Sequence, residues 1–327
     1  MDTKRVNWVH ICKILPQMYL LLRYAAFLCH MKNRFLVLWG TIFCSISLQH
    51  CTAQPTHLPD AVTNAPLSTR YWSSQPADSL IFVEKIQAIT GNTLSERILQ
   101  VAQTFLGTPY ISHTLEINEK EQVVINLRGL DCWTFVESCT AFAITATDSV
   151  RSYEQYIDHI RQLRYRNGVV DGYGSRLHYF SEWVLNGIEK GYFYDITQEL
   201  GGVKLTKKIQ FITQNPKLYP KTRDSLALTK ILLAQDRINA QEWFYIPKYK
   251  VKNIEDKIQP GDMIVITSNV KGLDVEHQGF AIRGQDGLLR LFHASSTSQK
   301  VTISKRSLSE YLGKVPAMSG IMVLRMN

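Results

Sequence analysis

The hydrophobic pattern changes character along the chain, and this change constrains the fold more than any other feature. Apolar residues recur at helical spacing in several segments before residue 240, whereas short apolar segments separated by turn residues predominate after residue 260. Helices followed by a series of strands are typical of an α+β fold. The chain has 327 residues, 45% of them hydrophobic, which is enough to bury a sizeable core.

The expected elements follow from this periodicity. We expect helices over residues 94–106, 132–147, 153–164, 177–190 and 224–238. We expect strands at 121–127, 263–267, 278–283, 288–294, 300–303 and 320–325. Ser307 with Glu310 three residues later resembles a capping box, which predicts a short helix through Leu312.

The N-terminal region has the pattern of a secretory signal peptide. Met31 is followed by two basic residues, an apolar run over 35–48 and a small-residue end at Ala53. We therefore expect residues 1–53 to be a leader, and the mature protein to be exported to the periplasm or cell envelope. A membrane anchor is less favoured, because the run is shorter than the roughly 20 residues of a spanning helix. Lipidation of Cys51 ranks below both, because no small residue stands directly before it.

The charge balance gives no support for a nucleic-acid partner. The net charge is +9, but residues 1–53 contribute six basic residues and one acidic residue, so the remainder carries +4. That excess is mild, and no basic block is interleaved with aromatic residues. Residues 54–79 are rich in Pro, Thr and Ser and indicate a linker, followed by one domain over 80–327.

Cysteine usage points to a functional thiol. Four of the six cysteines lie in the expected leader, which leaves Cys132 and Cys139. These two stand seven residues apart on one predicted helix, roughly 10 Å along its axis, too far apart to form a disulfide. Exported proteins normally pair their cysteines, so an unpaired thiol at the start of a helix suggests a use for it.

The local sequence around Cys132 suits a nucleophile. Asp131 is a good N-cap, which places Cys132 in the first helical turn. There, free backbone N–H groups and the helix dipole are expected to lower the thiol's pKa and favour the reactive thiolate. The alternative is a buried structural cysteine, an interpretation that fits Cys139 well because it lies in an apolar stretch.

Two histidines in the strand-rich region complete a possible catalytic set. His277 opens a predicted strand and shares a face with the small residues Gly279 and Ala281, where the Cys132 helix could pack closely. His293 ends the next predicted strand, where it could hold the His277 ring in the correct tautomer. An ordinary hydrogen-bonded histidine is the alternative for each. A zinc site formed by these three residues is less favoured, because they lack the paired spacing of zinc motifs.

Five segments in order resemble the markers of NlpC-type cell-wall cysteine peptidases, which are papain-like enzymes. They are Leu106–Tyr110, Asp131-Cys132, Pro260–Ile264, His277–Gly279 and His293-Ala294. The likeness is greatest to a narrower branch, the N-acetylmuramoyl-L-alanine amidase-like proteins. Its features match residues 131–137, 175–183 and 272–277.

The resemblance implies a fold and residue roles. It implies a helix-borne cysteine packed on a small antiparallel sheet, with a helical insertion at about 148–257. Cys132 would be the nucleophile, His277 the base and His293 the orienting residue. Tyr110 would help the Cys132 backbone N–H hold the oxyanion, unless it is only a turn tyrosine beside Pro109. No metal or cofactor is implied.

The insertion departs from the wider family and is expected to form the substrate wall. Arg176, His178 and Tyr179 follow a glycine-rich stretch, and arginine suits the carboxylates of peptidoglycan stems. Trp133 replaces the serine that usually follows the cysteine, and with Asp131 it completes the expected substrate contacts. The alternative is a surface loop and an amphipathic helix with core aromatic residues.

Together these features predict an exported cysteine hydrolase whose substrate is a peptidoglycan fragment or muropeptide, with no stable membrane span after leader removal. The resemblance favours cleavage of the N-acetylmuramoyl-L-alanine amide. Cleavage of the D-glutamyl–diamino acid bond is the first alternative, and a catalytically inert wall-binding module is an alternative of another class.

Overall fold

The order of elements in the protein matches an α+β fold. The computed structural model describes residues 72–327, so the expected leader and most of the expected linker lie outside the described residues. The helices are α2 (Pro76–Gln87), α3 (Leu94–Thr104), α4 (Cys132–Thr145), α5 (Tyr153–Arg164), α6 (Phe180–Glu189), α7 (Phe211–Gln214), α8 (Ser225–Asn239) and α9 (Leu308–Gly313). The strands are β1 (Trp72–Ser73), β2 (Val123–Val124), β3 (Phe193–Asp195), β4 (Val203–Leu205), β5 (Trp243–Pro247), β6 (Met263–Ser268), β7 (Val275–Arg283), β8 (Leu289–Ser295), β9 (Lys300–Ile303) and β10 (Met318–Met326).

Eight of these strands form one antiparallel sheet in the order β4-β5-β10-β6-β7-β8-β9, and β3 pairs with β10 as well. The register of β6 and β7 places Ile266 opposite His277, and a bulge follows directly. The register of β8 and β9 places His293 opposite Thr302. The insertion is therefore not purely helical, because β3, β4 and β5 all come from it and extend the sheet beyond the five strands expected between residues 263 and 325.

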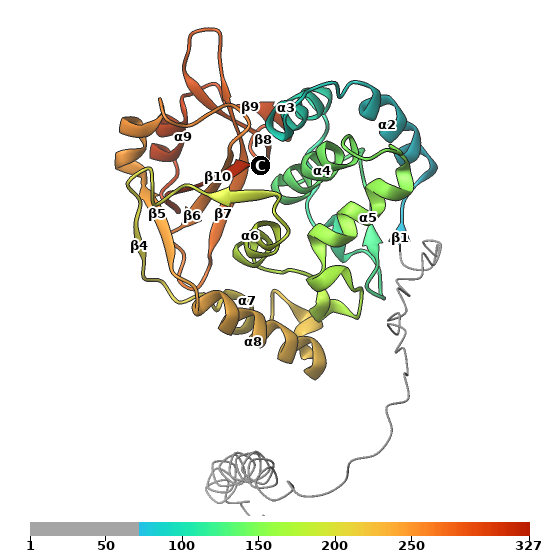
Figure 1. Ribbon diagram of the computed structural model, residues 1–327. Coiled ribbons are helices and arrows are strands. Elements are labelled where there is room, and N and C mark those ends of the chain that lie inside the picture. The colour runs from blue at the N-terminus through green and yellow to red at the C-terminus, as the bar shows by residue number, and fades with distance from the viewer. Residues whose placement is uncertain (1–71) are drawn as a thin grey trace, which may run out of the picture. The chain divides into compact units, whose positions relative to one another are not determined.

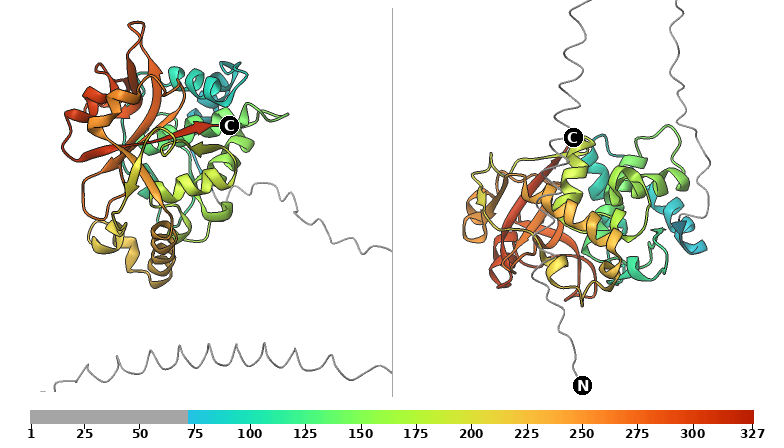
Figure 2. Two further views of the ribbon diagram at one scale, coloured as in Figure 1. Left: turned by 60° about the vertical axis from the view of Figure 1, so that its left-hand side comes forward. Right: turned by 90° about the horizontal axis from the view of Figure 1, so that it is seen from below.

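The sheet is buried on both faces. Side chains of successive strand residues point to opposite faces, and the core divides accordingly. Phe280 and Phe292 belong to the larger hydrophobic cluster, where their rings lie 5.9 and 5.7 Å from the ring of Phe135 in α4. Ala281 and Leu291 belong to the second cluster, which includes α9. Figure 1 shows α3, α4 and α5 on one side of the sheet, with α5 beyond α4, and Figure 2 shows the same division from two other directions.

The folded domain begins earlier than the sequence indicated. Helix α2 starts at Pro76, inside the stretch expected to be a linker. Its Phe82 and Ile86 are buried in the larger cluster, so α2 is part of the folded domain. Within residues 72–327, no helix is both long and apolar enough to span a membrane.

Candidate active site

Cys132 occupies the first residue of α4, as predicted. The side chain of Asp131 accepts a hydrogen bond from the backbone N–H of Thr134 at 2.8 Å. The hydroxyl of Thr134 accepts one from the backbone N–H of Asp131 at 2.9 Å. This reciprocal capping box fixes where the helix begins, and it holds Cys132 at the helix N-terminus.

His277 and His293 are brought together by the pairing of β7 with β8. Their Nε2 and Nδ1 atoms lie 2.5 Å apart, so the two rings share a hydrogen bond. Tyr311 of α9 lies beside both, with ring centroids 6.5 Å from His277 and 5.4 Å from His293. The side chains of His277 and His293 are 9% and 2% exposed, so this pair is shielded from bulk water.

The Cys132 thiol lies near β7, at the residue that follows His277. The backbone N–H groups of Gln278, Trp133 and Cys132 itself face the sulfur and favour its thiolate form. Burial raises the pKa of Tyr110 to about 12, and the charge of a Cys132 thiolate adds to this rise, so Tyr110 lies near the thiol. Folding therefore places Cys132 of α4 near Gln278 of β7, the residue that follows His277 in the chain.

The electrostatics of the thiol differ from the expectation. Desolvation raises the pKa of Cys132 to about 12, and the Asp131 carboxylate adds to the effect. These causes outweigh the backbone N–H groups at the helix N-terminus, which were expected to lower the pKa. Burial and the neighbouring His293 lower the pKa of His277 to about 3, so thiol and imidazole are both neutral at neutral pH.

The small residues after His277 serve a different neighbour from the one predicted. A Cβ atom on Gly279 would lie 2.5 Å from the carbonyl oxygen of Phe292 and 3.0 Å from the Cβ of His293. Gly279 therefore allows close approach of β8, not of α4. Ala281 packs in the second cluster with α9, so the face that contacts α4 carries Phe280 instead.

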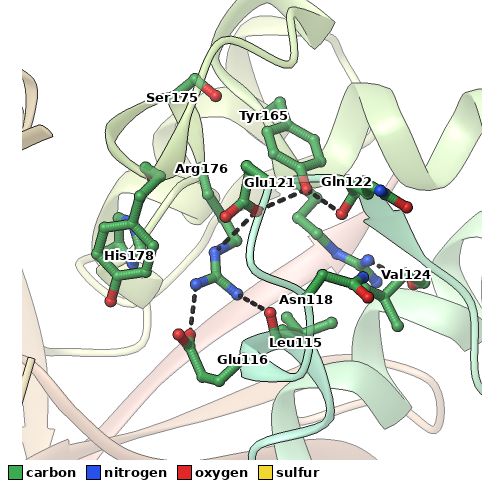
Figure 3. Close-up of polar contacts among 12 residues, drawn as sticks. Leu115, Glu116, Asn118, Glu121, Gln122, Val124, Tyr165, Ser175, Arg176 and His178 are labelled. Atoms are coloured by element: carbon green, nitrogen blue, oxygen red, sulfur yellow. Dashed lines mark hydrogen bonds and ion pairs between the residues drawn. The ribbon is translucent and has the colours of Figure 1, made fainter. Parts of the chain in front are cut away.

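Arg176 does not stand in an open substrate wall. Its guanidinium is buried, donates to Glu116 and to the carbonyl oxygen of Leu115 at 3.3 Å, and lies 3.4 Å from Glu121 (Figure 3). The phenol of Tyr165 also donates to Glu121, at 2.8 Å. The carboxylates that satisfy Arg176 thus belong to the protein itself, and this placement fits a structural role.

The other expected substrate contacts are also engaged internally. The His178 ring bonds the carbonyl oxygen of Tyr173 at 2.7 Å. The Tyr179 hydroxyl accepts from the backbone N–H of Ile212 at 2.8 Å, and its side chain is 2% exposed. Trp133 stays partly exposed beside Cys132 and packs edge-on against Phe180 at 5.1 Å. Of the predicted contacts, Trp133 and Asp131 lie at the thiol.

A cavity of about 390 Å³ opens beside the histidine pair, and His293 and Tyr311 form part of its lining. Tyr311 was not singled out from the sequence, where only its position in the short predicted helix was evident. Among residues 72–327, no three His, Cys, Asp or Glu side chains converge in a way that could hold a metal ion, so the zinc alternative lacks a ligand set there.

The fold and this site define an α+β protein with a cysteine at a helix N-terminus beside a paired histidine. The family model of N-acetylmuramoyl-L-alanine amidase-like proteins (AmiA-like) matches residues 100–321. The chain therefore belongs to this amidase-like family of peptidoglycan hydrolases.

Several solved structures are similar to this chain. An N-acetylmuramoyl-L-alanine amidase from Bacteroides uniformis is 36% identical, with a TM-score of 0.66, and the match covers 72% of this chain and 99% of that one. A Bacteroides fragilis structure with a provisional xylanase name is 34% identical, covers 69% and 99%, and has a TM-score of 0.61. A Legionella pneumophila protein shares the fold at 22% identity, covering 76% and 93%, with a TM-score of 0.57. No curated protein matches the chain.

Proposed function

We propose that this protein is an exported, papain-like cysteine hydrolase of the NlpC type that cleaves the N-acetylmuramoyl-L-alanine amide of peptidoglycan. The observation that carries the proposal is the position of the Cys132 thiol near Gln278 of β7, the residue after His277, together with the His277–His293 hydrogen bond. The family membership and the amidase name of the Bacteroides uniformis structure support the choice of bond.

The tautomers of the two histidines follow from their hydrogen bond. Nε2 of His277 contacts His293, so Nδ1 is the nitrogen left to accept the thiol proton. Nδ1 can accept only if Nε2 carries the ring hydrogen and donates it to Nδ1 of His293. His293 then fixes both the tautomer and the orientation of the base, which is the role of the third member of a triad.

The neutral resting state determines the order of proton transfers. The sulfur of Cys132 attacks the lactyl carbonyl carbon as His277 takes the thiol proton, because a free thiolate is disfavoured in this desolvated site. The backbone N–H of Cys132 and the hydroxyl of Tyr110 stabilise the oxyanion. The imidazolium of His277 gives its proton to the leaving amine, and the C–N bond breaks to leave a thioester. Water, deprotonated by His277, then hydrolyses the thioester and regenerates the thiol.

Digestion of defined muropeptides tests the proposal. The wild-type chain is expected to release the intact stem peptide with L-alanine at its N-terminus, and Cys132→Ala is expected to release none. Cys139→Ala is the matched control, since that cysteine is fully buried in the core and should leave the products unchanged. A shortened stem, with L-Ala-D-Glu left on the sugar, would instead assign the D-glutamyl–diamino acid bond. Equal product from Cys132→Ala would overturn the cysteine mechanism.

A further inference from the structure

The cavity beside the histidine pair has a basic rim. Lys305 and Arg306 follow β9, and Lys314 follows α9, and all three line the cavity. Their side chains are exposed. Within residues 72–327, none of the three has an ion pair or a side-chain hydrogen bond. Unpaired cations that gather around one concave surface are suited to an anionic ligand.

The rest of the lining is compatible with a polar ligand. Thr297 and Ser298, on the turn between β8 and β9, add hydroxyl groups to the wall. Hydroxyls can donate to carboxylate oxygens as well as accept from amides. Among residues 72–327, no acidic residue lines this cavity, so no side chain in the described wall would repel an anion.

The location of the cavity fixes which part of the substrate it faces. His293 and Tyr311 form part of its lining. His293 is hydrogen-bonded to the His277 ring, and the Tyr311 ring lies 6.5 Å from it, centroid to centroid. In the proposed reaction, His277 gives its proton to the leaving amine, so the leaving group must lie on the histidine side of the thiol. For the proposed bond, that leaving group is the stem peptide.

The chemistry of the two halves of the substrate agrees with this direction. The stem peptide carries free carboxylates on its D-glutamyl and diamino acid residues. The muramoyl half has none, because its lactyl carboxyl is part of the scissile amide. We propose that the cavity bounded by Lys305, Arg306 and Lys314 is the subsite for the stem peptide and selects it through its carboxylates. This inference rests on the proposed function for which half of the substrate faces the cavity, but what it adds is a binding site for that half.

Binding to an inactive chain tests the subsite apart from catalysis. Calorimetric titration of the Cys132→Ala chain would use L-alanyl-γ-D-glutamyl-diaminopimelate and the same tripeptide with its carboxylates amidated. The acidic peptide is expected to bind more tightly, and salt is expected to reduce the difference by screening. Removing one cation by Lys305→Ala or Arg306→Ala should weaken binding of the acidic peptide about two- to fivefold, the range for exposed ion pairs.

Two further variants complete the test. Combining Lys305→Ala, Arg306→Ala and Lys314→Ala should lower the affinity for the acidic peptide by about tenfold or more. The affinity for the amidated peptide should not change. Lys257→Ala is the matched control. This exposed lysine precedes β6 and lies near Arg283, at the far end of β7 from His277, so its removal should leave binding of the acidic peptide unchanged. Equal affinities of parent and triple variant for the acidic peptide, or equal affinities of the two peptides for the parent, would overturn the subsite. Failure of the proposed function would appear separately, as the wrong product in the muropeptide digestion.

Discussion

Replacing His293 tests whether it acts through His277. His293→Ala removes the only hydrogen-bond partner that the His277 ring has among residues 72–327 and leaves Nε2 in a shielded site. A buried polar group without a partner costs about 1–3 kcal/mol. If that cost falls on the transition state, in which His277 is charged, kcat decreases by about 5- to 150-fold. His293→Asn should recover part of the loss, because its amide oxygen can accept the same hydrogen.

The pH profile separates this positioning role from general damage to the fold. His277 must be neutral to act as a base, so activity is lost as the pH falls through its pKa. Burial and His293 together hold the pKa of His277 at about 3. His293→Ala removes the effect of His293 and reduces the burial of His277, so the pKa of His277 should rise. The acid limb of kcat/KM should therefore move to higher pH. An unmoved acid limb, with Asn no better than Ala, would refute the reasoning.

Three other predictions follow from the same contacts. Arg176→Met should lower the free energy of unfolding by about 3–5 kcal/mol, because it leaves the buried Glu121 without its cation. Urea denaturation measures this free energy. A large rise in KM without loss of stability would contradict the structural role of Arg176. Asp131→Asn keeps an N-cap but removes a charge that raises the pKa of Cys132. Iodoacetamide should then label Cys132 faster at an unchanged Tm, and an unchanged labelling rate would count against this. Burial lowers the pKa of His178, His277 and His293, so below about pH 6.5 the unfolded chain binds more protons than the folded chain. The free energy of unfolding should therefore fall as the pH falls below about 6.5, by at most about 1.4 kcal/mol per pH unit for each histidine. Unfolding free energies that stay flat from pH 7 to 5 would exclude it.

Much of the fold could be predicted where one strong local signal decides the element. Helix α5 spans the predicted residues, because it has an N-cap and a clear amphipathic pattern. The strand β9 also spans the predicted residues. Helix α2 was missed because Pro76 stands in a Pro- and Ser-rich stretch typical of linkers, although proline is favoured in the first helical turn.

The site could be predicted in part, for the same physical reason. Cys132, His277 and His293 are recognisable from residue type and from their positions at the ends of elements. The structural role of Arg176 could not be predicted, because its partners Glu116 and Glu121 lie about 60 residues away in the chain. No local sequence pattern reveals such pairing. The pKa of Cys132 was mispredicted as lowered, because desolvation depends on tertiary packing that the helix start alone does not reveal.

The most direct test of the central claim is a mass measurement of the enzyme during turnover. A muropeptide reaction quenched in acid within milliseconds, followed by proteolysis and mass spectrometry, should show a muramoyl thioester on the peptide that contains Cys132. The adduct should be absent from Cys132→Ala. A chain that releases the stem peptide at the wild-type rate with Cys132 replaced, or that carries the acyl group on another residue, would contradict the account.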